Sequence, residues 1–311
     1  MLNNILHLFG ETPRTRRKAF WGIALILPNT LGLFFFFGLP VLIAFRVSLQ
    51  EWNLLKPPEF IGLENFQTML HDDDFWQALG NTLKLLLFTV PVELVLALSV
   101  ALMLNQRLRF RGLFRAAFFL PVVTSTVAAS IVWVWVFQPS YGLLDNMLLS
   151  PLGFSEIKWL TRPDLVLYPI AVVSIWQRLG FDMILFLAGL QSIPGVLYEA
   201  AVIDGASRWQ RLRYVTLPML SPTTFLVVML SVIYGFQIFD QVYIMTARTV
   251  PGGVRGSATT LTYYLYEEGF ANSRFGYASA LALVLFAIIL TVTIIQLKMQ
   301  RRWVYYESGE V

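Results

Sequence analysis

The sequence contains no cysteine and only two histidines, His7 and His71. A disulfide framework and a cysteine-ligated zinc or iron–sulfur site are therefore excluded, and two histidines do not build a histidine-rich metal cluster. We expect no metal site in this chain.

Two kinds of catalytic motif are also missing. The string Gly-x-x-x-x-Gly-Lys-Ser/Thr does not occur, so the chain has no loop of the kind that cradles nucleotide phosphates. It has no HExxH string either, and its two histidines offer no credible nucleophile–base pair. We expect a protein that is not an enzyme and binds no cofactor of its own.

Charge is scarce as well. Only 14% of the 311 residues are charged and 57% are hydrophobic, with a mean hydropathy of +0.64, which indicates a polytopic membrane protein rather than a soluble domain. A bilayer core about 30 Å thick needs roughly 20 apolar residues in a helix. The sequence predicts an all-α protein with six spans, near residues 20–49, 78–104, 113–137, 165–190, 218–240 and 277–297.

The positions of lysine and arginine predict the orientation, because translocated short loops are poor in positive charge. Fourteen of these residues flank one set of span ends and six flank the other set, while Arg46, Lys84 and Arg178 lie within spans. Both termini are therefore expected in the cytoplasm, and no nucleic-acid partner is needed to explain the net charge of +4. The predicted parts are an N-terminal tail at 1–19, a transmembrane domain at 20–297 and a C-terminal tail at 298–311.

The cytoplasmic stretch from Glu199 to Pro218 differs from an ordinary polar loop. It consists of helix-forming residues with a central Asp204–Gly205 break, so we expect two short helices around a turn. Its small residues would let another protein approach closely, and its charged edges would orient that protein. An amphipathic helix lying on the membrane surface is the alternative.

The same stretch closely resembles the EAA loop of binding-protein-dependent ABC importer permeases. It reads Glu-Ala-Ala, two residues, Asp-Gly-Ala, and then Leu-Pro twelve residues after that glycine. Leu212 departs from the family, which more often has phenylalanine there. The residues that the resemblance assigns to ATPase coupling are Glu199, Ala200, Ala201, Asp204, Gly205, Ala206, Leu212, Leu217 and Pro218.

The resemblance covers nearly the whole chain and is strongest to the carbohydrate-importer branch, in segments 61–66, 114–121 and 187–194. It departs at 247–253, where the family commonly has a glycine-rich stretch ending in proline. The resemblance implies a type I permease fold in the bacterial cytoplasmic (inner) membrane. It also implies a second, similar permease, two ATPase subunits that bind ATP and magnesium, and a solute-binding protein that delivers a sugar, oligosaccharide, polyol or glycerol-phosphate-type solute.

Two polar groups within the spans are candidates for the substrate path. Tyr234, Gln237 and Gln241 recur at i, i+3 and i+7, which predicts one stripe on the fifth helix. The alternative is polar packing between helices. Further candidates are Gln177, Arg178 and Asp182; the last two have the i, i+4 spacing of an ion pair, which is either structural or in contact with substrate.

An ion-coupled secondary transporter is the alternative function, with Glu93, Arg178 and Asp182 as its coupling groups. The absence of an internal repeat and the presence of the EAA string oppose it. Glu93 itself is a lone carboxylate in the second span, and we expect it to pair with a neighbouring helix or subunit.

Overall fold

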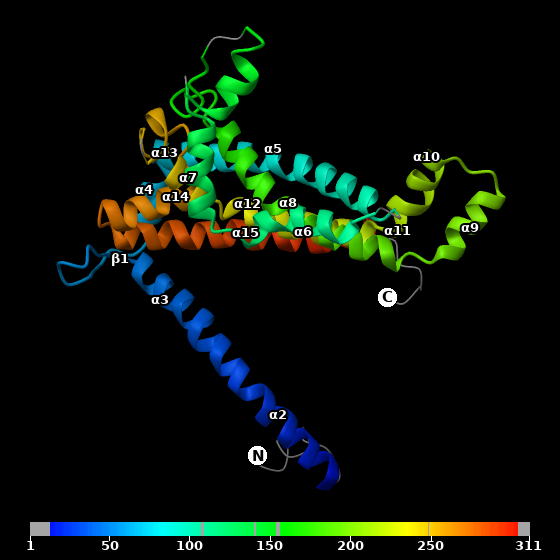
Figure 1. The fold of residues 1–311 in the computed structure, drawn as a ribbon. Coiled ribbons are helices and arrows are strands. Elements are labelled where there is room, and N and C mark those ends of the chain that lie inside the picture. The colour runs from blue at the N-terminus through cyan, green and yellow to red at the C-terminus, as the bar shows by residue number, and fades with distance from the viewer. Residues whose placement is uncertain (1–12, 107–108, 140, 154–155, 248, 304–311) are drawn as a thin grey trace.

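The computed structural model describes residues 13–106, 109–139, 141–153, 156–247 and 249–303, and these are almost entirely helical (Figure 1). The all-α class is therefore confirmed. The predicted tails 1–19 and 298–311 lie largely outside the described residues. The described helices are α2 (Pro13–Leu33), η1 (Phe34–Gly38), α3 (Leu39–Ser48), α4 (Glu64–Leu70), α5 (Asp73–Leu104), α6 (Arg111–Val123), α7 (Thr126–Val136), η2 (Asp145–Leu149), α8 (Leu167–Ser192), α9 (Gly195–Ile203), α10 (Arg208–Arg211), η3 (Leu212–Thr216), α11 (Leu217–Met219), α12 (Ser221–Phe236), α13 (Asp240–Thr246), η4 (Val254–Gly256), α14 (Leu261–Tyr266), η5 (Glu267–Ala271) and α15 (Phe275–Trp303).

Four unbroken helices in the described residues are long and apolar enough to cross a bilayer, and two bent helix pairs bring the candidates to as many as six. The four are Arg17–Ser48, Asp73–Leu104, Leu167–Ser192 and Phe275–Gln300, which confirms the predicted helices near 20–49, 78–104, 165–190 and 277–297 to within a few residues. A single two-stranded hairpin stands among the described elements, with β1 (Gln50–Glu51) antiparallel to β2 (Glu59–Phe60).

The predicted span 113–137 is not one continuous helix. Helices α6 and α7 meet at an angle of 99°, because Thr124 is extended and Ser125 caps α7, its hydroxyl accepting from the Ala128 amide. The backbone freed by the break does not go unsatisfied, since the Gln177 side chain on α8 donates to the Thr124 carbonyl at 3.3 Å. Irregular backbone at membrane depth is tolerated where protein buries it in this way.

The predicted fifth span, 218–240, is also broken. Helix α12 meets the preceding helical segment at 66° and ends at Phe236, with the chain resuming as α13 only at Asp240. The carbonyls of Phe236 and Ile238 each accept a hydrogen bond of 2.9 Å from a threonine hydroxyl, of Thr262 and Thr260 respectively. Both predicted spans are thus broken helices whose free backbone groups are satisfied by side chains distant in the sequence.

The buried apolar residues form three clusters along the bundle. One joins mainly α7, α8 and α13, a second joins α5, α12, α14 and α15, and a third joins α5, α8 and α12. Helix α8 contributes to the first and third clusters and α5 has residues in all three, so these two helices are the frame on which the polar side chains described below are placed.

Helices α6 and α8 cross very closely at Gly180. A Cβ atom built on this glycine would lie 2.1 Å from the Phe118 carbonyl oxygen. We therefore expect Gly180→Ala to force the two helices apart and to destabilise the folded protein by about 1–3 kcal/mol, the usual cost of overpacking. Thermal unfolding of the purified protein would measure this, with Gly112→Ala on α6 as the control because nothing lies within 4 Å of its added Cβ. Equal unfolding midpoints would contradict the close crossing.

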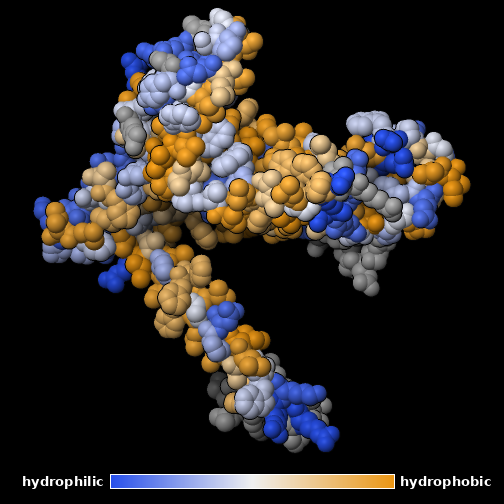
Figure 2. Space-filling model, in the orientation of Figure 1, coloured by the Kyte–Doolittle hydropathy of each residue, from blue (hydrophilic) through white to orange (hydrophobic). Residues whose placement is uncertain are grey.

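The first span stands apart from the bundle (Figure 1), and no residue of its most apolar window is buried within the protein. Figure 2 shows a mostly hydrophobic surface along this helix and across the bundle, with hydrophilic residues toward the ends. An apolar helix of this kind is stable only where lipid or another protein covers it. The surface is that of a multi-pass membrane protein.

At the opposite end of the bundle from α9 and α10, Asp72 ties three helices together. Its side chain caps α5 by accepting from the Asp74 amide at 3.0 Å, and it also accepts from the hydroxyls of Tyr264 and Tyr277. Burial raises the pKa of the Asp72 carboxyl, but these hydrogen bonds outweigh it and the pKa is lowered. The contacts anchor α14 and α15 to the start of α5.

Candidate functional site

A buried polar network lies where the two helix breaks meet. Its side chains come from α5, α7, α8, α12 and α13, and it includes five of the six predicted path residues, all except Gln237. Broken helices that expose backbone beside polar side chains are a common construction for solute sites in transporters. We treat this network and the loop 199–218 as the two candidate functional regions.

Arg178 forms the charged half of the network. Its Nε atom lies 3.1 Å from Glu93 Oε1 and 3.5 Å from Asp182 Oδ2. The predicted i, i+4 pair is thus confirmed, and so is the expectation that Glu93 pairs with a neighbouring helix. Ser231 on α12 also donates to Asp182, at 3.3 Å. One guanidinium therefore joins carboxylates from α5 and α8.

The Arg178–Glu93 contact is a close ion pair rather than an aligned hydrogen bond, since the N–H direction does not point at the carboxylate oxygen. The guanidinium also lies over the Tyr234 ring, 4.8 Å from its centroid, at a separation where a cation is attracted to the face of an aromatic ring. Tyr234 therefore links the charged half to the neutral half.

The neutral half is a chain of amides and hydroxyls. Gln241 donates to the Tyr234 hydroxyl at 3.1 Å and to Gln177 Oε1 at 3.3 Å. Gln177 in turn donates to Thr126 Oγ1 at 2.9 Å. Sequence reasoning found the two glutamines but missed Thr126 and Ser231, which carry no signal beyond an isolated hydroxyl in an apolar helix.

Gln237 lies outside this network. Because α12 ends at Phe236, Gln237 is the residue that follows the helix, and its side chain is exposed. The predicted i, i+3, i+7 stripe is therefore wrong in its geometry. Tyr234 and Gln241 still meet, but across a break in the chain rather than along one helix.

The network offers hydrogen-bond donors and acceptors, a cation and an aromatic ring in a largely buried setting. Groups of this kind recognise hydroxyl-rich solutes by direct hydrogen bonding. Among the described residues, no group of three or more histidine, aspartate or glutamate side chains is placed to hold a metal ion. The chemistry available is reversible binding.

The loop 199–218 forms the second region, as two short helices around a turn, as predicted. Helix α9 ends in a Schellman motif, with the Ala206 amide bonded to the Ala201 carbonyl at 2.9 Å and the Gly205 amide to the Val202 carbonyl at 3.0 Å. Gly205 has φ +73°, a left-handed conformation that glycine adopts without strain.

A capping box opens the second helix: the Ser207 hydroxyl accepts from the Gln210 amide and the Gln210 side chain accepts from the Ser207 amide. The loop projects at the end of the bundle formed by α9, α10 and α11 (Figure 1), and Tyr198 and Thr216 tie its base together with a hydroxyl contact of 3.0 Å. Ile203 is 85% exposed and Trp209 66%. Large apolar side chains on a projecting loop mark a contact surface.

The nine predicted coupling residues all lie in this projecting unit. Glu199, Ala200 and Ala201 belong to α9, and Asp204, Gly205 and Ala206 form the turn. Leu212 opens η3, and Leu217 and Pro218 belong to α11. All nine are exposed or half-exposed, and none is buried.

Comparison with known proteins places this arrangement in context. Residues 93–305 match the family described as "Binding-protein-dependent transport system inner membrane component". The matched region contains both the loop 199–218 and every member of the polar network.

Two curated relatives are each 36% identical. The arabinooligosaccharides transport system permease protein AraP of Bacillus subtilis aligns over 88% of this chain and 86% of its own. The trehalose/maltose transport system permease protein MalF of Thermococcus litoralis aligns over 92% and 95%. Among solved structures, a bacterial ABC transporter involved in the import of the acidic polysaccharide alginate is 26% identical, with a TM-score of 0.79 over 92% of this chain and 96% of the other.

Proposed function

Because the chain belongs to the family of binding-protein-dependent transport system inner membrane components and is a permease subunit of an ABC importer, we propose how its parts serve that role. Both bent helix pairs count as spans, which gives six, with both termini in the cytoplasm as the positive charges indicate. The chain pairs with a second, homologous permease. Two ATPase subunits, which bind ATP and magnesium, and an extracytoplasmic solute-binding protein complete the importer.

The single observation that carries the proposed path is the polar network between the two helix breaks. Its charged half joins three helices through Arg178, and its neutral half ends at the junction of α6 and α7. Side chains from so many elements change their spacing whenever the helices move relative to one another. Such a site alternates between two affinities, which is what an importer needs in order to accept and then release its solute.

The proposed solute is a sugar or oligosaccharide. Relatives named for arabinooligosaccharides and for trehalose and maltose align over most of this chain. Gln177, Gln241 and Tyr234 provide hydrogen bonds and a ring of the kind that sugar hydroxyls and ring faces contact. Polyols and glycerol-phosphate-type solutes remain within the same chemistry.

The loop 199–218 is the proposed coupling element. Its exposed apolar residues and the Asp204–Gly205 turn stand clear of the bundle, where a soluble ATPase subunit reaches them. An ATPase that binds the loop more tightly in one arrangement of the helices shifts the permease toward that arrangement. The ion-coupled alternative has no support, because the family model and the aligned structure are those of binding-protein-dependent and ABC transport.

We expect Gln241→Leu to impair transport far more than Gln237→Ala. Gln241 holds two hydrogen bonds within the network, and each typically contributes about 0.5–1.5 kcal/mol, whereas Gln237 is exposed beyond the end of α12. The importer is purified with its partner subunits and its solute-binding protein, which is first screened against arabino-oligosaccharides, trehalose and maltose. ATP-driven uptake of the bound sugar into proteoliposomes is then compared between the variants.

Two results would contradict this proposal. Uptake that follows an imposed ion gradient and ignores ATP would overturn the importer mechanism. Wild-type uptake by a fully assembled Gln241→Leu complex across a range of sugar concentrations would show that the network is packing and not path.

A further inference from the structure

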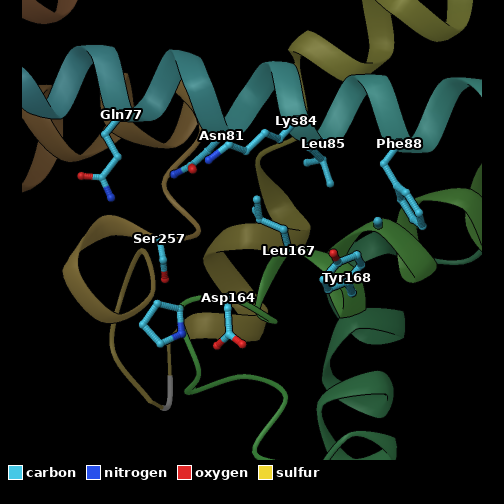
Figure 3. Close-up of a pocket in the computed structure, with 11 residues that line it drawn as sticks. Gln77, Asn81, Lys84, Leu85, Phe88, Asp164, Leu167, Tyr168 and Ser257 are labelled. Atoms are coloured by element: carbon cyan, nitrogen blue, oxygen red, sulfur yellow. The ribbon is translucent and has the colours of Figure 1, made fainter.

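A cavity lies apart from the polar network, between the N-terminal halves of α5 and α8. It has a volume of about 410 Å³, within the range of small-molecule sites. Figure 3 shows Lys84 and Phe88 on α5 facing Tyr168 at the start of α8 and Ser257 in the loop before α14. None of these residues takes part in the polar network.

The cavity carries an unbalanced positive charge. Lys84 is exposed, and no carboxylate of the described residues forms an ion pair with it. The one acidic residue in the lining, Asp164, is already paired with Arg162 at 2.5 Å. An ammonium group in a partly enclosed, half-apolar pocket attracts an anion more strongly than one on an open surface.

Neutral groups complete the cavity. Phe88 and Tyr168 meet edge to face, 5.7 Å between ring centroids, and remain 42% and 49% exposed, so both present ring surface at the rim. The Asn81 amide nitrogen holds the loop by donating to the Gly256 carbonyl at 2.9 Å. Ser257 Oγ is buried without a hydrogen-bond partner among the described residues, so the ligand-facing groups of the cavity are Lys84 and the two rings.

The cavity and the network lie on one stripe of α8. Ala171 lines the cavity and Arg178 centres the network. A spacing of seven residues places them on the same face, about 10 Å apart along the helix axis. The cavity therefore lies two helical turns before the network on the same face of α8.

We propose that this cavity is an outer binding site for an acidic sugar, in which Lys84 pairs with the carboxylate and Phe88 and Tyr168 contact the ring. The proposal rests on the proposed importer function, because the cavity is taken as an additional binding site for the transported solute. The cavity would select acidic sugars, whereas the polar network alone does not distinguish acidic from neutral sugars.

The test uses the assembled importer in phosphatidylcholine nanodiscs without ATP, with D-glucuronate and D-glucose as probes that differ only in the carboxylate. Saturation-transfer NMR titrations give the affinity of each. We expect glucuronate to bind more tightly than glucose, and Lys84→Met to weaken glucuronate by about tenfold or more, the usual loss of a charge-assisted contact. Lys84→Arg, which keeps the charge, should stay within about threefold of wild type.

Lys56→Met is the matched control, since Lys56 is an exposed lysine in the hairpin loop outside the cavity, and it should leave glucuronate binding unchanged. Equal affinity for both probes, or wild-type affinity in Lys84→Met, would overturn the proposal. A lipid could also occupy the cavity. If phosphatidylglycerol displaces glucuronate, and co-purifies with wild type but not with Lys84→Met, the occupant is a lipid headgroup and the proposal is overturned. Stimulation of ATP hydrolysis by the solute-binding protein is measured separately on wild type, so a failure of importer function is distinguishable from a failure of this site.

Discussion

Replacing Arg178 by methionine is expected to destabilise the folded protein by about 3–5 kcal/mol, because it strands buried carboxylates without their counter-charge. The side chains of Glu93 and Asp182 are 4% and 0% exposed, and both lie within 3.5 Å of the Arg178 guanidinium. Thermal unfolding of the purified complex, together with its yield from the membrane, measures the effect.

The control for this experiment is a variant in which the whole cluster is neutral: Arg178→Met with Glu93→Gln and Asp182→Asn. Removing all three charges leaves no uncompensated ion, so the triple variant should be more stable than Arg178→Met alone. Arg162→Met offers a comparison at the surface, where the pair with Asp164 is open to solvent and its loss should barely shift the unfolding midpoint. A triple variant no more stable than the single would argue that Arg178 does not balance these carboxylates.

Part of this cluster was predictable because it is local. Arg178 and Asp182 are four residues apart on one helix, and that spacing alone brings them together. Glu93 was expected to find a partner, since a lone carboxylate does not persist in an apolar helix. Its partner was not predictable, because the contact joins α5 to α8 and depends on how these helices pack.

The prediction of a continuous fifth span was wrong for the same reason, because the outcome depends on contacts between segments far apart in the sequence. Gly235 is the only glycine or proline between Tyr234 and Gln241, and a lone glycine is tolerated inside a helical pattern, so the sequence predicts that the helix continues. The break is stabilised by hydroxyls of Thr260 and Thr262, more than twenty residues further along the chain. Helical periodicity holds no information about such distant bonds, so Gln237 was wrongly placed beside its neighbours.

The sequence of the third span contains a local signal for the helix break, but a prediction from hydropathy alone does not use it. Pro121 is followed by Thr124 and Ser125, and Ser125 is a favoured N-cap residue at the head of the apolar run of α7. A long hydrophobic stretch predicts one span when only its length is counted. The cap residue marks where that stretch divides into two helices.

The loop 199–218 was predicted well because its signals are short-range. The Asp204–Gly205 break predicts a turn, and the observed Schellman motif is built from residues within one helical turn of Gly205. Such a turn needs a residue that tolerates positive φ, which glycine does at no steric cost. The local geometry of the proposed coupling element is therefore predictable from the sequence, whereas the contacts of the polar network are not.

That geometry leads to the prediction with the largest expected functional effect: Gly205→Val should abolish coupling between the ATPase subunits and the permease. At φ +73° a β-branched residue is strained by about 1–3 kcal/mol, and relief of the strain unwinds the turn that joins α9 to α10. No atom lies within 4 Å of the added Cβ, so the defect comes from backbone strain and from bulk on the docking surface, not from a clash inside the subunit. The spans should insert normally.

Gly195→Val is the matched control, because it adds the same volume at an open position at the start of α9, just before the loop, where φ is not positive. Gly205→Asn tests the strain alone, since asparagine tolerates the left-handed region better than other non-glycine residues. We expect Gly205→Val complexes to lose attached ATPase or its stimulation by the loaded solute-binding protein, Gly195→Val to keep both, and Gly205→Asn to fall between them. ATPase retention, stimulated hydrolysis and transport are measured on the same preparations, and wild-type values in all three for Gly205→Val would show that the loop does not couple ATP hydrolysis to transport.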